Sequence, residues 1–144
     1  MKIAIGSDHA GFTMKEYIIS NLSAQGYVFQ DYGTYSEISM DYPDTAHPLA
    51  NDVQSGIYKF GILICGSGNG VAITANKYKG IRAALCWNDE ITSLARKHNN
   101  ANIIALPARF ISLDEAVKFS LIFLDTNFEG GRHQNRVEKI SNIL

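Results

Sequence analysis

One segment of the chain places reactive side chains among glycines, directly after an apolar run. Residues 65–70 have the sequence CGSGNG, so the thiol of Cys65 and the hydroxyl of Ser67 flank the first of three alternate glycines. Backbone amides in such a loop, together with the amino terminus of a following helix, can bind a phosphate or the oxygen of an enediolate. The pattern predicts an anion-binding loop made of Gly66, Ser67, Gly68, Asn69 and Gly70.

Cys65 is the candidate base of this segment. The alternative is a small buried apolar residue, which is the usual place of a cysteine in a folded core. Its position at the end of an apolar run, against a helix amino terminus that stabilises a thiolate, favours reactivity. An unperturbed thiol, with a pKa of about 8.5, would be little ionised at neutral pH without such help. Cys86 has no comparable surroundings and is assigned to the core.

A second segment, residues 6–11 (GSDHAG), puts a carboxylate and an imidazole side by side before a predicted helix. In one interpretation Asp8 caps that helix and His9 is an incidental loop residue. In the other, both face a cleft, where Asp8 orders substrate hydroxyls or assists proton transfer and His9 offers a hydrogen bond. The hexapeptide by itself favours neither.

His98 and Asn99 lie at the carboxyl end of a predicted helix, the wrong end for a site at the glycine loop. A histidine there often only balances the helix dipole. In a dimer, however, His98 can enter the cleft of the partner as a general acid poised near neutral pH.

The tail carries basic residues that suit a phosphate. Arg132 and Arg136 are four residues apart on a predicted helix, so their guanidinium groups share one face and can grip a dianion. A solvated helix face is the alternative. Three more side chains are candidates for the same site: Arg109 and His133 for the phosphate, and Tyr42 for the wall of the cleft.

A parallel sheet must position these segments. Short apolar, β-branched runs recur at five places, each followed by a helix-like stretch, which is the pattern of an α/β fold: 2–7, 27–33, 60–65, 81–86 and 102–106. The third run is nearly continuous in apolar residues, as expected of a central strand covered on both faces. Ligands bind beyond the carboxyl ends of such strands, where residues 6–11 and 65–70 lie.

Helical periodicity predicts the helices that cover this sheet. The first helix carries Lys15 on a side away from its apolar stripe and closes at Gly26 in a left-handed conformation. A later helix begins with a capping box of Ser112 and Glu115. The chain then turns at residues 130–131 and enters a final helix. The residues expected to be buried are Met14, Ile18 and Leu22 in the first helix and Leu113, Val117, Leu121 and Leu124 in the later one.

Length and composition bound the class of protein. With 144 residues, 46% of them hydrophobic, we expect one domain over residues 1–144. A net charge of -1 with interspersed signs argues against a nucleic-acid partner. The chain shows neither a signal-peptide layout nor an apolar stretch of membrane-spanning length, so we expect a cytoplasmic protein without a membrane partner. Two distant cysteines and the absence of metal-ligand spacing predict no disulfide framework and no metal.

Six motifs, taken in order, resemble the type B ribose-5-phosphate isomerases, within a family that includes galactose-6-phosphate isomerase subunits: residues 6–11, 41–43, 65–70, 75–77, 97–99 and 129–133. The resemblance covers essentially the whole chain. It implies a three-layer Rossmann-like α/β sandwich with a five-stranded parallel sheet and a C-terminal helix. It also implies a homodimer or dimer of dimers with active sites shared between subunits, and no organic cofactor.

By position, the resemblance implies that Cys65 is the base for the C2 proton and that Ser67 assists at the C1 and C2 oxygens. His98 would open the furanose ring with help from Asp8. One branch of the family has a glutamate just after the glycine loop; that position is Val71 here, so the chain looks like the cysteine branch. Many members carry threonine at the position of Ser67. The residues implied to hold substrate or its phosphate are His9, Asn99, Arg109, Arg132 and Arg136.

The implied reaction is the interconversion of ribose 5-phosphate and ribulose 5-phosphate through a cis-enediolate, a step of the pentose phosphate pathway. An isomerase of allose or galactose 6-phosphate is the alternative within the same chemistry. A nucleotide-binding module is a different class, supported by Asp89, which follows the glycine loop at the distance of a ribose-binding acid. The loop is G-x-G-x-G after the third run rather than G-x-G-x-x-G after the first, which disfavours the module.

Overall fold

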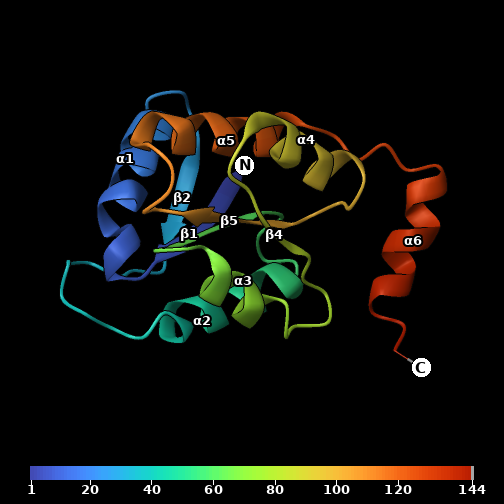
Figure 1. Ribbon diagram of the computed structural model, residues 1–144, viewed down its shortest axis with the longest axis horizontal. Helices are drawn as coiled ribbons and strands as arrows, with labels where there is room; N and C mark the ends of the chain where they lie inside the picture. The colour runs from blue at the N-terminus through green and yellow to red at the C-terminus, as the bar shows by residue number, and fades with distance from the viewer. Residues whose placement is uncertain (144) are drawn as a thin grey trace.

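A twisted sheet of five parallel strands runs through the centre of the computed structural model, which describes residues 1–143 (Figure 1). The strand order is β2-β1-β3-β5-β4. All five predicted strands are confirmed, although the second and fourth are shorter than expected. Their bounds are Lys2–Ser7 for β1, Val28–Asp31 for β2, Gly61–Cys65 for β3, Ala83–Leu85 for β4 and Ile103–Pro107 for β5.

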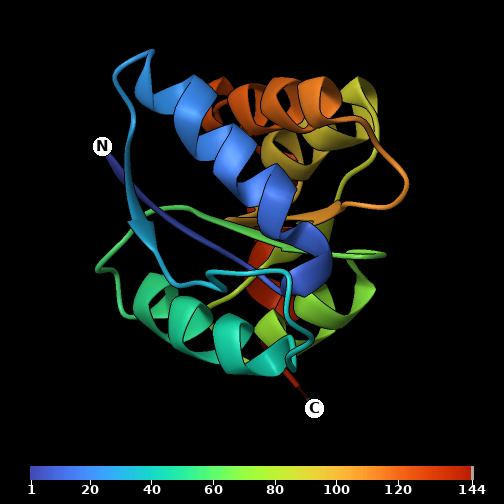
Figure 2. The same ribbon diagram turned by 90° about the vertical axis from the view of Figure 1, so that its left-hand side faces the viewer.

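Helices cover both faces of the sheet and make the expected three layers (Figures 1 and 2). One layer contains α1 (Phe12–Ser23), which follows the short 3-10 helix η1 (His9–Gly11), together with α4 (Asp89–Lys97) and α5 (Leu113–Asp125). The opposite layer contains α2 (Pro43–Gln54) and α3 (Asn69–Ala75). The last helix, α6 (Arg132–Ile140), projects away from these layers, beyond the end of α4 (Figure 1).

Each face of the sheet buries its own apolar cluster. Every residue of β3 is buried, as predicted for a central strand. Its side chains alternate between the two clusters: Ile62 and Ile64 face the layer of α1, α4 and α5, whereas Leu63 and Cys65 face α2 and α3. This alternation follows from the period of two in a strand, and it turns Cys65 toward the side on which the glycine loop begins α3.

The predicted face of α5 is partly wrong. The capping box of Ser112 and Glu115 is present, and Leu124 is buried as expected. Leu113, Val117 and Leu121 are only partly buried against the core. The helix instead buries a neighbouring stripe, because it packs between α1 and α4. The buried residues are Ala116, Phe119, Ser120, Phe123 and Leu124.

Helix α1 differs from the expectation at one residue, whereas the left-handed conformation of Gly26 after its end is confirmed. Its apolar residues Met14, Ile18 and Leu22 are buried as predicted, but Lys15 is fully buried as well. The Lys15 ammonium lies 2.7 Å from Asp31 Oδ2 and over an aromatic ring, which compensates the cost of removing it from water. The helix ends at Ser23, and Gly26 follows with φ 96, so that the Tyr27 amide reaches back to the Leu22 carbonyl.

The strand order creates a switch point between β1 and β3, since the chain leaves β1 toward β2 on one side and β3 pairs on the other. A crevice at the carboxyl ends of these two strands is the usual ligand site of an open parallel sheet. Asp8 follows β1 and Cys65 ends β3, so both lie at this edge. Within residues 1–143, no helix has the length and apolar character needed to cross a membrane.

Candidate active site

A pocket of about 450 Å³ opens at the switch point. It collects most of the residues that the sequence analysis assigned to the glycine loop, the β1 end and the cleft wall. Because β1 and β3 are neighbours, the two chemically reactive segments meet here although they are more than fifty residues apart. The lining residues are Asp8, Tyr42, Cys65, Gly66, Ser67, Gly70, Arg109 and Phe110.

The glycine loop crosses directly from β3 into α3, a helix of seven residues. Gly68 is the N-cap of α3 and has φ 75, a conformation that few residues other than glycine adopt. A Cβ at this position would lie 2.4 Å from Leu85 Cδ1. The Asn69 amide donates to Ser67 Oγ at 3.2 Å. The amides of Ser67 and Gly68 donate to no acceptor within the described part of the chain, so they are available to an oxyanion.

Two side chains pack closely over glycines of the loop. The Arg109 guanidinium lies over Gly66, where an added Cβ would be 2.9 Å from Nη1, and the Arg109 amide donates to the Gly66 carbonyl at 3.0 Å. The ring of Tyr42 lies over Gly70, where an added Cβ would be 2.5 Å from the ring. Tyr42 is the N-cap of α2, with Pro43 at the first position of that helix. The pocket therefore has one cationic wall and one aromatic wall.

The two cysteines have different surroundings, as predicted. Cys65 is 5% exposed and packs at the edge of the core beneath α2 and α3, yet it lines the pocket. Cys86 is completely buried in the opposite core, and burial raises the pKa of its thiol to about 11. Cys65 is thus the thiol that a substrate in the pocket can reach.

The structure combines the two interpretations of residues 6–11. Asp8 caps η1, since its Oδ1 accepts from the Gly11 amide at 3.1 Å, and it also lines the pocket. Burial at 7% exposure and the cap together hold the carboxylate in one orientation. His9 is not among the residues that line the pocket. Its Nδ1 accepts from the Met40 amide at 3.2 Å, which ties η1 to the loop that precedes α2.

A second group of predicted site residues lies at the opposite edge of the sheet. His98 is the C-cap of α4, and its ring stacks on that of His133 with centroids 4.1 Å apart and planes at 14°. Glu129 Oε1 is 3.7 Å from His98 Nε2 and 3.5 Å from His133 Nε2. Burial, together with the nearby His98 and Arg132, lowers the pKa of His133. The neutral form of His133 is therefore favoured.

These three side chains have the composition of a metal site, with ligand atoms that lie within 4.8 Å of one another. A shared ion would have to lie in the planes of both imidazole rings, along their nitrogen lone pairs. Since the rings are stacked and nearly parallel, their lone pairs do not converge on one point. The arrangement favours a carboxylate that faces two neighbouring ring nitrogens.

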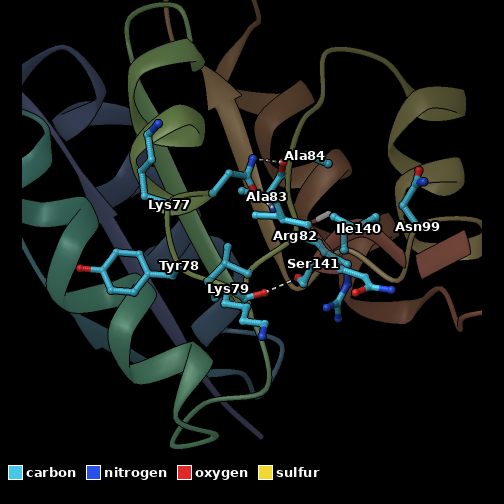
Figure 3. Close-up of a pocket in the computed structure, with 14 residues that line it drawn as sticks. Lys77, Tyr78, Lys79, Arg82, Ala83, Ala84, Asn99, Ile140 and Ser141 are labelled. Atoms are coloured by element: carbon cyan, nitrogen blue, oxygen red, sulfur yellow. Dashed lines mark hydrogen bonds between the residues drawn. The ribbon is translucent and has the colours of Figure 1, made fainter. Parts of the chain in front are cut away.

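The remaining tail residues are not brought to the pocket within one chain. Arg132 and Arg136 are exposed on α6, and Asn99 lines a separate groove of about 730 Å³ between the end of α6 and β4 (Figure 3). All strands are parallel, so the segment that precedes β5 lies at the amino edge, whereas Cys65 lies at the carboxyl edge. His98, Asn99 and α6 are therefore separated from the pocket by the length of the sheet.

Two residues near the sites were not singled out from the sequence. Phe110 lines the pocket beside Arg109, at the end of β5, and its position after a strand was the available signal. Glu129 faces both stacked histidines. Its spacing of four residues from His133 was a weaker signal, because Glu129 lies before α6 whereas His133 lies in the first turn of that helix. Asp89, the support for a nucleotide module, pairs with Lys118 at 2.7 Å and lines a different pocket.

Comparison with known proteins agrees with this geometry. The sequence model of a family described as Ribose/Galactose Isomerase matches residues 3–140. Ribose-5-phosphate isomerase B of Escherichia coli K12 is 43% identical over 142 residues, which cover 99% of this chain and 95% of that protein. A D-erythrulose-4-phosphate isomerase of Pectobacterium atrosepticum is 42% identical, covering 97% and 93% of the two chains.

The fold has an equally similar solved counterpart. The crystal structure of ribose-5-phosphate isomerase B from Mycoplasma genitalium with bound ribulose 5-phosphate superposes with a TM-score of 0.93 at 43% identity. The match covers 98% of this chain and 94% of that one. The matches in sequence and fold thus extend over nearly the whole chain, and the chain belongs to the ribose/galactose isomerase family.

Proposed function

We propose that this protein is an aldose-ketose isomerase that interconverts D-ribose 5-phosphate and D-ribulose 5-phosphate, a step of the pentose phosphate pathway, in the cytoplasm. Residues 1–144 act as one isomerase domain. The observation that carries the proposal is the position of Cys65, whose thiol lines a pocket beside Asp8 and a loop with unused backbone amides. A close relative with ribulose 5-phosphate bound supports the choice of substrate.

The proton transfer uses the carboxyl edge. The Cys65 thiolate removes the proton from C2 of the open-chain aldose, and the electron pair moves through C1 to leave a cis-enediolate. The amides of the glycine loop and the Ser67 hydroxyl stabilise the oxyanion as it forms. The proton of the C2 hydroxyl passes to the C1 oxygen through the Ser67 hydroxyl, and the thiol returns the abstracted proton to C1, which gives the ketose. Asp8 holds a substrate hydroxyl and assists its proton transfer.

The acid and the phosphate-binding residues come from the amino edge. His98 protonates the ring oxygen of the furanose as its bond to C1 breaks, while the C1 hydroxyl gives its proton to Asp8, and the aldehyde is released. Arg132 and Arg136 hold the phosphate as a charge-assisted pair. The other residues proposed to contact substrate or its phosphate are His9, Asn99, Arg109 and His133.

Because the two edges are far apart in one chain, the proposal requires a second copy. A two-fold axis that brings the carboxyl edge of one subunit against the amino edge of its partner completes two sites per homodimer. The groove beside α6 supports this arrangement, since it is lined by Ile140 and Ile143, which are 54% and 90% exposed (Figure 3). A dimer of such dimers keeps the same shared sites.

Mixing two inactive variants tests the shared site. Cys65→Ala and His98→Asn each inactivate both sites of their own dimer. In a mixed dimer, one site receives both changes and the other receives neither. Random exchange of subunits therefore restores about one quarter of wild-type activity. Activity that stays at the level of the separate variants, although the mixed dimer has been isolated through two affinity tags, would exclude a site shared between subunits.

The length of the sugar is tested by a panel of aldose phosphates. Tetrose and hexose phosphates are real alternatives, since one relative acts on D-erythrulose 4-phosphate and the family description includes galactose. We expect the highest kcat/KM for ribose 5-phosphate over erythrose 4-phosphate, allose 6-phosphate and galactose 6-phosphate. A higher value for any of the other three would reassign the substrate while keeping the chemistry. Absence of turnover with all four would contradict the proposed function.

A further inference from the structure

Arg96, in the last turn of α4, is a buried cation with 5% of its surface exposed. Its Nη1 donates to the Asn100 side chain at 2.9 Å and to the Ala101 carbonyl at 2.6 Å. Its Nε donates to the Thr126 carbonyl at 3.1 Å. Within residues 1–143 the guanidinium forms no ion pair, so neutral oxygens compensate its charge.

Two aromatic rings complete the site of this cation. The Arg96 Cζ lies 4.8 Å from the centroid of Phe60 and 5.7 Å from that of Phe123. The two rings pack edge to face with centroids 5.5 Å apart. A planar guanidinium is suited to such stacking, whereas a lysine ammonium is not. Burial, together with the nearby Arg82, lowers the pKa of the Arg96 guanidinium.

The three acceptors of Arg96 belong to two separate segments of the chain. Asn100 and Ala101 follow His98 and Asn99 at the end of α4, whereas Thr126 begins the connection from α5 to α6. A second bond joins the same segments, since the Glu129 amide donates to the Lys97 carbonyl at 3.1 Å. Arg96 and this bond hold the turn that carries His98 against the connection that leads into α6.

Asn100 is the hinge of the first segment. It has φ 47, a left-handed conformation that asparagine tolerates better than most residues. Its side chain accepts from Arg96, and its carbonyl accepts from Arg82 Nε at 2.9 Å. Hydrogen bonds therefore hold the turn from two sides. In this conformation the His98 ring stacks on His133.

An apolar residue would fill the site of Arg96 at less cost. Replacing a buried charge by a hydrophobic side chain of similar volume is often neutral or stabilising for a fold. What the arginine adds is geometry, because its fork fixes two segments relative to each other at defined distances. Those segments carry the acid and the phosphate-binding side chains of the proposed site.

We propose that Arg96 is a positioning residue, which sets His98 relative to the basic residues of α6 and thereby supports ring opening and phosphate binding, but not proton transfer at Cys65. This inference rests on the proposed function. It separates the reaction into a part that depends on Arg96 and a part that does not. The two parts can be measured independently.

Two assays on Arg96→Met distinguish the parts. For isomerisation of ribose 5-phosphate, we expect KM to rise and kcat to fall by about tenfold each, since a misplacement of about 1 Å can cost up to a hundredfold. Exchange of a C1 hydrogen of ribulose 5-phosphate with deuterium oxide needs no ring chemistry, because this ketose is acyclic. At saturating ribulose 5-phosphate, we expect its rate to stay within about twofold of wild type.

Matched variants exclude a loss of stability as the cause. Leu22→Ala shortens a side chain of the same core, on α1 rather than on the segments that Arg96 joins. It is therefore expected to lower Tm and to leave KM unchanged. Asn100→Gly retains the positive φ and removes one acceptor, and we expect a smaller rise in KM than for Arg96→Met. Arg96→Lys reaches fewer of the oxygens and is expected to lie between wild type and Arg96→Met. If Arg96→Met does not fold, these two variants carry the test.

Two results would overturn the inference. One is a KM for ribose 5-phosphate that none of the three variants changes. The other is deuterium exchange that falls in proportion to isomerisation. Binding of inorganic phosphate, measured by calorimetry, gives a readout without turnover. We expect the Kd for phosphate to rise about tenfold in Arg96→Met. A wild-type protein without isomerase activity whose phosphate affinity still depends on Arg96 would contradict the proposed function while keeping the positioning role.

Discussion

The carboxyl and amino edges of the sheet differ in how their functional side chains are held. At the carboxyl edge, Cys65 and Asp8 are almost fully buried and sit at the ends of adjacent strands. At the amino edge, the side chain of His98 is 39% exposed, and Arg132 and Arg136 project from a helix that stands apart from the body (Figure 1). The side chains of the carboxyl edge line a pocket within one chain. The side chains named at the amino edge do not line that pocket.

A buried cation lies behind each edge, but the two cations are compensated differently. Lys15 pairs with the carboxylate of Asp31, whose other oxygen accepts from the Gly33 amide. The Gly33 carbonyl in turn accepts from the Ser7 amide, just before Asp8. Arg96 forms no ion pair within residues 1–143; it donates to neutral oxygens and lies over ring faces. The carboxyl edge is therefore supported through an ion pair and the amino edge through a guanidinium fork.

The largest effect is expected at the carboxyl edge. Cys65→Ala removes the base, so both isomerisation and deuterium exchange at C1 should fall by at least about a thousandfold, while the thermal transition stays close to that of wild type. Cys86→Ala is the matched control and should retain activity within about twofold, although it shrinks a buried side chain. Initial rates of both variants measure the contrast. Full activity in Cys65→Ala would remove the thiol from the mechanism.

At the amino edge, His98→Asn separates the acid from the base. Isomerisation of ribose 5-phosphate should fall by about a hundredfold, because a positioned general acid contributes on that order. Deuterium exchange into ribulose 5-phosphate should persist, since Cys65 and the loop amides are unchanged. Nuclear magnetic resonance of the C1 hydrogens measures this exchange. Equal losses in both assays would place His98 in the proton transfer itself.

A smaller effect is expected from Arg136→Ala. Loss of charge-assisted hydrogen bonds to the phosphate costs about 1.5–3 kcal/mol, which corresponds to a rise in KM of about 10- to 100-fold with a smaller change in kcat. Lys139→Ala removes a positive charge from the same helix and should change KM by less than about twofold. Steady-state kinetics at two salt concentrations tests both variants. Equal effects of the two would indicate a general field rather than a specific contact.

The smallest effect concerns pH. The pKa of His133 is lowered in the folded protein, so the unfolded chain binds more protons as pH falls below about 6.5. This histidine contributes stability that is present above that pH and is lost as pH falls toward its folded pKa. We expect a lower Tm at pH 5.5 than at pH 7.5.

His133→Gln should reduce this dependence on pH, because glutamine does not titrate in the range. Scanning calorimetry of both proteins at the two pH values measures the difference. A variant with the same slope as wild type would assign the loss of stability to other groups.

Much of the fold followed from local sequence, since strand runs and glycine turns act over a few residues. The face of α5 did not, because its apolar residues surround more than half of the helix and only packing against α1 and α4 decides which stripe is innermost. The burial of Lys15 was also hidden, since its carboxylate partner Asp31 lies on another element. Contacts between residues that are distant in sequence are the hardest to predict from one sequence.

The candidate site divides in the same way. Cys65, Ser67 and Asp8 were found from strand ends and glycines, which are local signals. The position of Glu129 beside His98 was not predicted, because it depends on how the connection to α6 folds back against α4. The assignment of His98 to a partner's site remains a prediction, which came from its position at the wrong end of a helix.

The contact between Tyr42 and Gly70 links two positions that are 28 residues apart in sequence. An added methyl group at position 70 would lie 2.5 Å from the phenol ring, so the ring would have to shift to admit a larger residue there. Among related proteins, a larger residue at position 70 should accompany a smaller one at position 42. Such paired substitutions would change the width of the cleft mouth, which gives natural variation a simple route to sugars of another size.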